Sequence, residues 1–231
     1  MELEGRMSHS YRALLGSEDV DRLSKEDRIG VAVLIATQHM RTRDFRDIIK
    51  EASEYTLKHA RSPDVVTDAE ALERLKTFAK EEPAKRLQFT LVARSISEFA
   101  ALLLEMKWIL LINETGSPFW CSDNPFTYSN VFCYDEYDGL GFERLGSQTH
   151  FPLNPRLSLE IVDPVTYVGY PNHVIADGLE NVVFNNHLQV KNSRRHIFSP
   201  TDDFTLAERM MQKNRGLRNI DENRFKTENS I

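Results

Sequence analysis

The chain has 231 residues, of which 41% are hydrophobic and 28% are charged. A chain of this length can bury a core large enough to fold without disulfide or metal staples, and we expect a single domain over residues 1–231. Its formal net charge of −6 argues against general nucleic-acid binding, although a local basic groove is not excluded by charge alone.

The front half of the chain has the apolar spacing of helices. Residues 1–20 are expected to be partly helical. Ser24, with acidic residues in the turn after it, is typical of a helix N-cap and predicts a helix to about residue 60, straight or with a bend. A capping-box pattern at Thr67 predicts a second helix to about residue 80, and Pro83 begins a third. We therefore expect a helical layer over about 20–106.

The back half is divided into short apolar runs by glycine and proline. These runs predict strands over 108–113, 118–121, 148–152 and 157–162, in a small and mostly antiparallel sheet. A helix over 181–194, a strand at 197–198, a closing helix over about 200–215 and a frayed tail over 217–231 follow. Because the strand-rich part, about 108–198, is separate from the helical layer, we expect an α+β fold in which the helical N-terminal half packs on the sheet.

The sequence lacks the common motifs of nucleotide, metal and nucleophile sites. It has no P-loop, no dinucleotide-binding glycine pattern, no HExxH and no GxSxG elbow. Its seven histidines are scattered without metal-ligand spacing. We expect no cofactor and no bound metal.

Cysteine usage and hydropathy predict the compartment. The two cysteines, Cys121 and Cys133, are too close for a disulfide framework, so we expect reduced thiols and a cytoplasmic location. The start of the chain has no apolar stretch of the kind found in signal peptides. The most apolar run, residues 99–112, is shorter than a bilayer span and contains Glu105 and Lys107. We therefore expect a soluble protein with no membrane partner.

The most distinctive motif is Ser-Asp-Asn-Pro at residues 122–125, where a predicted strand ends. Its polar side chains can bond nearby backbone amides, so one interpretation is a well-made turn. The other is a cleft in which Asp123 acts as a base or an anchor. Because strand side chains alternate, we expect Asp123 to face the helical layer together with Phe119, and to bind an arginine, first Arg41 and otherwise Arg156.

Three further polar features accompany this motif. Gln38 and Arg41 share one face of the first long helix, either as a solvated face or as a patch directed at the sheet. Arg156 follows a rigid corner and is interpreted mainly as a partner in a structural ion pair. Asn186 lies in a helical run, where asparagine is unfavourable, so it is kept for its hydrogen bonds or is exposed to solvent.

Taken in this order, the motifs resemble an uncharacterised family, the domain of unknown function 4238 (DUF4238). The resemblance rests on the helix at residues 36–42, on Trp108 followed by residues 118–125, on the turn at 152–156 and on the segment 186–198. Family members usually begin with an upstream segment, which we expect this chain to lack. The resemblance implies no known activity, but it makes seven residues candidates for one shared polar site: Gln38, Arg41, Ser122, Asp123, Asn124, Arg156 and Asn186.

Two functions are compatible with these observations. The first is a non-catalytic interaction or structural module whose polar motifs brace the sheet on the helices. The alternative is an enzyme acting on a polar or nucleic-acid-related ligand, with a site built from the Gln-x-x-Arg helix and the Ser-Asp-Asn-Pro turn. A cleft-facing Asp123 with Gln38 and Asn186 close by would favour the enzyme.

Overall fold

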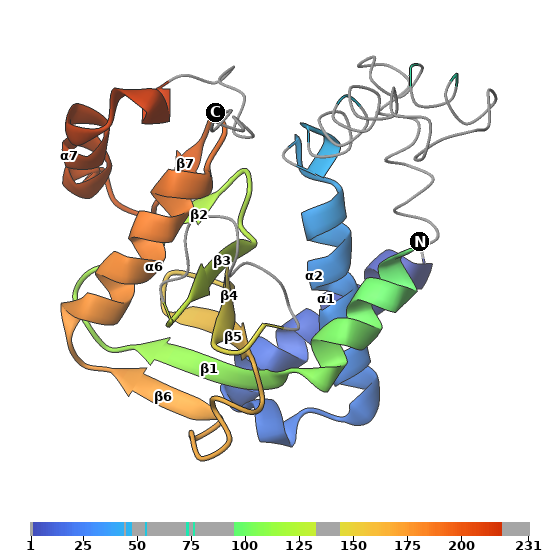
Figure 1. Cartoon of the computed structure of the whole chain (residues 1–231). Helices are drawn as coiled ribbons and strands as arrows, with labels where there is room; N and C mark the ends of the chain where they lie inside the picture. Colours follow the sequence, from blue (N-terminus) through green and yellow to red (C-terminus); the bar gives the residue numbers. More distant parts are fainter. Residues whose placement is uncertain are drawn as a thin grey trace.

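The computed structural model describes residues 2–43, 45–47, 54, 73, 76, 95–132 and 144–218 (Figure 1). The helix predicted over 67–80, much of the helix predicted to end near residue 60, and Cys133 lie outside these residues. Within them, helices lie on both sides of a mostly antiparallel sheet, so the predicted α+β class is confirmed.

The N-terminal helices form one layer. They are α1 (Glu2–Ser17), the 3-10 turn η1 (Val20–Arg22) and α2 (Lys25–Met40), and residues 95–105 are also helical. The predicted N-cap is confirmed, because Ser24 Oγ accepts the backbone N–H of Asp27 at 3.0 Å. The helix breaks at Arg41 and Thr42, and residues 43 and 45–47 are helical again, which is the bend that the sequence left open.

A five-stranded sheet forms the centre, in the order β3-β4-β5-β1-β6. Its strands are β1 (Lys107–Asn113), β3 (Thr127–Asn130), β4 (Ser147–Pro152), β5 (Leu157–Val162) and β6 (His173–Ala176). Neighbours are antiparallel except for β1 and β6, which are parallel. The predictions for β1, β4 and β5 are confirmed to within one residue at each end.

Other strands differ from the prediction. The strand expected over 118–121 is β2 (Cys121–Ser122), which pairs with β7 (Ile197–Phe198) in a separate two-stranded sheet. Because β3 is wholly polar apart from one tyrosine and β6 is short, neither carries the apolar run on which strand prediction depends, and both were missed.

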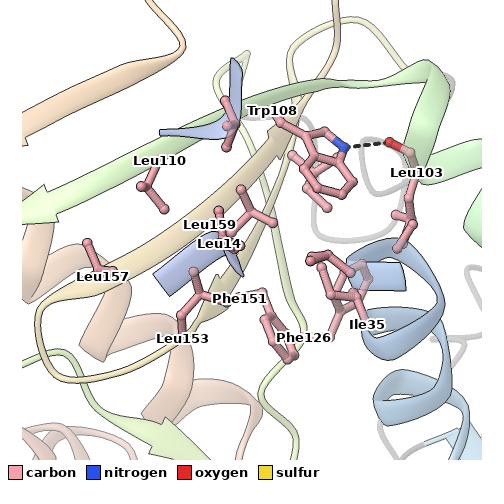
Figure 2. Close-up of a cluster of buried hydrophobic side chains, with 14 of the residues drawn as sticks. Leu14, Ile35, Leu103, Trp108, Leu110, Phe126, Phe151, Leu153, Leu157 and Leu159 are labelled. Carbon is pink, nitrogen blue, oxygen red and sulfur yellow. Dashed lines mark hydrogen bonds between the residues drawn. The ribbon is translucent and has the colours of Figure 1, made fainter. Parts of the chain in front are cut away.

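One face of the sheet packs on the N-terminal helices (Figure 2). Trp108 and Leu110 of β1 and Leu159 of β5 meet Leu14 of α1 and Ile35 of α2, and each of these side chains is at most 1% exposed. Burial of a large apolar side chain contributes roughly 1.5–3 kcal/mol, so this cluster is the main stabilising core. The one polar group of Trp108, its ring N–H, donates to the Leu103 carbonyl at 2.7 Å.

The opposite face is covered by α6 (Leu179–Asn192), where Leu111 and Phe119 pack with Val182. Beyond it, α7 (Thr205–Lys213) and η2 (Arg215–Arg218) complete the described chain. The closing helix was predicted to start near residue 200, but Asp203 accepts the Thr205 N–H and starts it later. Phe119 was expected against the first long helix, and that prediction is wrong.

Candidate functional site

A pocket of about 700 Å³ opens between α1, the C-terminal end of α2, the Ser-Asp-Asn-Pro turn and the segment around the end of β4. Four of the seven candidate residues line it: Gln38, Arg41, Ser122 and Asp123. The remaining wall is largely apolar and includes Met7, Leu34, Pro125, Phe151, Pro152 and Leu153. Asn124, Arg156 and Asn186 do not line this pocket.

The Asp123 carboxylate has backbone partners. Its Oδ1 accepts the N–H of Arg194 and its Oδ2 accepts the N–H of Arg195, each at 2.9 Å. The expectation of an arginine side chain is therefore wrong: the partners are peptide groups of the turn that follows α6. That turn reaches Asp123 because β2 pairs with β7, which begins two residues later.

The residues on either side of Asp123 bind the same end of α6. Ser122 Oγ donates to Gln189 Oε1 at 2.8 Å, and the Asn124 side-chain amide donates to the Asn192 carbonyl at 3.3 Å. Gln189 in turn donates to the Pro125 carbonyl at 2.9 Å. The whole motif thus attaches the C-terminal end of α6 to β2, which agrees with its interpretation as a turn.

Asn186 attaches the middle of α6. Its Oδ1 accepts the N–H of Trp120 at 2.8 Å, and its Nδ2 donates to the Pro118 carbonyl at 2.9 Å. The side chain is only 4% exposed, so it satisfies two backbone groups of a segment that forms no strand. Trp120 is buried beside Val190 and Ala207.

Arg156 belongs to a different contact. Its guanidinium donates to the carboxylate of Glu18, just after α1, and both side chains are more than a third exposed. The ion-pair interpretation of Arg156 agrees with this geometry, and its partner is an acidic residue far from the Ser-Asp-Asn-Pro turn.

Gln38 and Arg41 project from the last turn of α2 with exposed side chains. Among the lining residues that the structure describes, Arg41 is the only cation, and Glu4 and Asp123 are the acidic residues. No ion pair joins Arg41 to a described residue. An exposed guanidinium beside an apolar wall is suited to bind a carboxylate through two parallel hydrogen bonds.

Tyr11 of α1 and Cys121 of β2 also line the pocket, although sequence reasoning did not select them. Burial raises the pKa of Tyr11, with a further contribution from Cys121. Burial also raises the pKa of the Cys121 thiol, more than its contact with the Ser122 backbone lowers it. Both groups are therefore protonated near neutral pH, and the Tyr11 hydroxyl donates to the Leu153 carbonyl.

A second polar cluster lies on the face of the sheet that α6 covers. His150, which is 1% exposed, has Nδ1 at 3.2 Å from Glu160 Oε1 and Nε2 at 2.9 Å from Ser129 Oγ. Sequence reasoning missed this cluster because its members lie on three strands, one of which was not predicted. Strand alternation in β4 and β5 was the available signal, since it places His150 and Glu160 on one face.

Two further observations concern ligands and membranes. In the part of the chain that the structure describes, no group of three or more His, Cys, Asp or Glu side chains could hold a metal ion. Among the same residues, no helix combines the length and the hydropathy needed to cross a bilayer.

Comparison with known proteins gives one match. No curated protein and no solved structure matches the chain. A family model described as "Protein of unknown function (DUF4238)" matches residues 1–203. This match covers most of the 231 residues, including both polar clusters, so the chain belongs to the DUF4238 family.

Proposed function

We propose that the chain is a binding module whose pocket, lined by Gln38, Arg41, Ser122 and Asp123, takes a small organic anion with an apolar part. The observation that supports the proposal is the position of Arg41, which is the single cation among the described residues of a largely apolar pocket wall. A guanidinium that forms no ion pair with any described residue is available to a ligand carboxylate, and contact with the apolar wall removes ligand carbon atoms from water.

Binding without chemistry is favoured in this pocket because its polar groups are already engaged. Both Asp123 oxygens accept backbone N–H groups, and the Ser122 hydroxyl donates to Gln189. Tyr11 and Cys121 have raised pKa values, so neither supplies an anionic nucleophile near neutral pH. A general base needs a lone pair directed at the substrate, and an occupied carboxylate is a poor source of one.

The test compares two probes that differ in charge. We expect 4-phenylbutyrate to bind by isothermal titration calorimetry, and the matched neutral amide, 4-phenylbutyramide, to bind at least about tenfold more weakly, since a hydrogen bond to a charged group is worth about 1.5–3 kcal/mol. Amide-proton shifts in NMR spectra should concentrate on α1, the end of α2 and residues 121–125.

Substitution then assigns the effect to one side chain. Arg41→Gln should reduce the affinity for the carboxylate to that for the amide. Arg195→Gln is the matched control, because the side chain of Arg195 is exposed and does not line the pocket. Equal affinities for acid and amide in the wild type, or unchanged binding in Arg41→Gln, would reject the proposal.

A further inference from the structure

The second polar cluster is built on three adjacent strands of the central sheet, β3, β4 and β5 (Figure 1). His150 lies directly opposite Glu160 in the β4–β5 register and opposite Thr127 in the β3–β4 register. Ser129 is two residues further along β3 and therefore faces the same side as Thr127. The three side chains thus lie in a row on one sheet face, held by backbone pairing on both sides of His150.

The hydrogen bonds determine where the protons of His150 lie. Burial raises the pKa of Glu160, but the charge of a protonated His150 and hydrogen bonds from His150 and the Asn185 amide outweigh this effect, so the pKa of Glu160 lies below its ordinary value. An ionised carboxylate only accepts hydrogen bonds, so His150 Nδ1 carries a proton and donates to Glu160 Oε1. In neutral imidazole the other nitrogen, Nε2, is then the acceptor, and the Ser129 hydroxyl lies 2.9 Å from it.

The row can also hold an additional proton. Ser129 Oγ lies 2.9 Å from Gln148 Oε1 as well as from His150 Nε2. When His150 is neutral, the Ser129 O–H donates to Nε2. When His150 is doubly protonated, Nε2–H donates to Ser129 Oγ, and the Ser129 hydroxyl donates to Gln148. A general base must be stabilised before and after it takes a proton, and this arrangement provides partners for both states.

Ser129 is partly accessible, and exposed apolar side chains lie near its polar partners. The side chain is partly exposed and lies on β3, the edge strand of the sheet. The ring of Phe184, which is 44% exposed, packs edge-on against His150 with 5.5 Å between centroids. Val131, in the turn that follows β3, is 45% exposed. These side chains offer contacts to an alkyl or aryl group rather than to a charged one.

We propose that Ser129, His150 and Glu160 form a hydrolytic centre for carboxylic esters with an apolar acyl group. Ser129 is the nucleophile, His150 the general base and Glu160 the carboxylate that orients the imidazole. The centre lies on the sheet face opposite the α1–α2 core and shares no residue with the pocket that Arg41 lines. It therefore goes beyond the binding function and does not depend on it.

The reaction has two balanced steps. Ser129 Oγ attacks the ester carbonyl carbon, its proton moves to His150 Nε2, and the carbon–oxygen bond to the leaving group breaks. That proton then leaves with the alcohol. Water attacks the acyl-serine, gives one proton to His150 Nε2, and releases the carboxylic acid as Ser129 recovers its hydroxyl hydrogen from His150.

The first test uses the wild-type protein and needs no substitution. A fluorophosphonate probe phosphonylates an activated serine with loss of fluoride. Intact-mass spectrometry should show one adduct per chain, and peptide mapping should place it on Ser129. No adduct on the folded chain, or an adduct on a different serine, would overturn the proposal, since an accessible activated serine must react.

The second test measures hydrolysis of p-nitrophenyl butyrate. Ser129→Ala and His150→Gln should each lower kcat/KM by about 10³-fold or more, and Glu160→Gln should also lower it strongly, because triad members act as a unit. Ser199→Ala is the control, since among the described residues that hydroxyl forms hydrogen bonds only with the exposed Thr201. Circular dichroism confirms that each variant is folded. A folded Ser129→Ala that hydrolyses the ester as fast as the wild type would show that the cluster is structural.

Discussion

The Asp123 carboxylate accepts the backbone N–H of Arg194 at 2.9 Å, across more than seventy residues of sequence. Arg194 lies just after the C-terminal end of α6, where the helix dipole is unfavourable for a negative charge. The carboxylate is stable there because it binds the two peptide N–H groups that leave the helix, those of Arg194 and Arg195. Asp123 therefore determines where the chain turns from α6 into β7.

Removal of this carboxylate should destabilise the fold. Asp123→Ala loses two charge-assisted hydrogen bonds, and we expect the free energy of unfolding in urea to fall by about 2–4 kcal/mol. Asp123→Asn keeps one acceptor oxygen and should lose about half as much. Asp202→Ala, at an exposed aspartate before α7, is the control and should change stability by no more than about 0.5 kcal/mol. Equal stability of Asp123→Ala and the control would contradict this role.

Asn186 provides a test of the second attachment between α6 and the β2 segment. Asn186→Asp preserves shape but replaces the donor to the Pro118 carbonyl with an oxygen, and a buried negative charge then faces a carbonyl. We expect the free energy of unfolding to fall by about 2–4 kcal/mol at neutral pH. Part of this stability should return at acidic pH, because the new carboxyl group becomes protonated. Asn181→Asp, exposed in the first turn of the same helix, should be neutral or slightly stabilising. A melting temperature for Asn186→Asp like that of Asn181→Asp would reject this account.

The contacts of Asp123 and Asn186 show which features of the site could be predicted from the sequence. The Ser-Asp-Asn-Pro pattern predicts a turn because turn formation depends on neighbouring residues alone. Proline restricts the backbone of Asn124, and short polar side chains form hydrogen bonds with nearby amides. The pattern does not predict the partners, because these belong to a helix that follows sixty residues later. The apolar alternation of β5 similarly predicts where that strand begins and ends, whereas the polar sequence of β3 does not indicate a strand.

Helix α6 shows a second limit of pattern reading. Helical periodicity assigns the apolar face to the core, yet Asn185 and Asn186 are each 4% exposed while Val183 and Phe184 are each 44% exposed. Part of the sheet face beneath α6 is polar, with Ser158 and His150 buried, so hydrogen bonding as well as apolar packing decides which side of α6 is covered. Local composition does not contain that information, and the cluster around His150 was missed for the same reason.

Glu4 should weaken anion binding at the pocket. Glu4 is the acidic residue of α1 on the pocket wall, and Arg41 is the only cation among the wall residues for which coordinates are described. Glu4→Gln removes a repulsive charge, so we expect the affinity for 4-phenylbutyrate to rise severalfold at low salt, with less gain at high salt. The affinity for 4-phenylbutyramide should not change, since the amide has no charge. A gain for both probes would point to a steric effect, and would contradict the electrostatic explanation.

Asp163 should make stability depend on acidic pH. Burial raises its pKa, but hydrogen bonds from the Thr166 hydroxyl and from the N–H groups of Gly146, Val165 and Thr166 outweigh burial, so the pKa lies below its ordinary value. A carboxyl with a lower pKa in the folded state stabilises the fold above its unfolded pKa, about 3.9, and loses that contribution as pH falls through the folded value.

The comparison variant for this effect is Asp163→Asn, which cannot ionise and places an amide donor near N–H groups. We expect it to be less stable than the wild type by about 2–3 kcal/mol at neutral pH, with the difference narrowing below about pH 4. Asp177→Asn, at an exposed position before α6, is the control, and its difference in stability from the wild type should not change with pH. If the free energies of unfolding of the wild type and Asp163→Asn differ by the same amount at pH 7 and at pH 3, the ionisation of Asp163 does not contribute to stability in the way proposed.

Gly146 should tolerate no side chain, for two reasons that can be separated. Its φ is +76°, which L-residues rarely adopt, and an added Cβ would lie 2.5 Å from Phe132 Cδ2 and 2.8 Å from Asn130 Oδ1. This backbone also presents the Gly146 N–H to Asp163 at 2.9 Å. We expect Gly146→Ala to lower the free energy of unfolding by about 1–3 kcal/mol.

Gly169→Ala is the matched control, because no atom lies within 4 Å of its added Cβ and its φ is not in the left-handed region. It should stay within about 0.5 kcal/mol of the wild type. A double-mutant cycle with Phe132→Ala separates the two costs: the ring clash disappears in the double variant, while the backbone strain remains. A Gly146→Ala penalty that vanishes completely in the Phe132→Ala background would show that the clash alone requires glycine. A penalty that persists would show that the Phe132 ring is not the whole reason, and would leave the positive φ and the Asn130 Oδ1 contact as its causes.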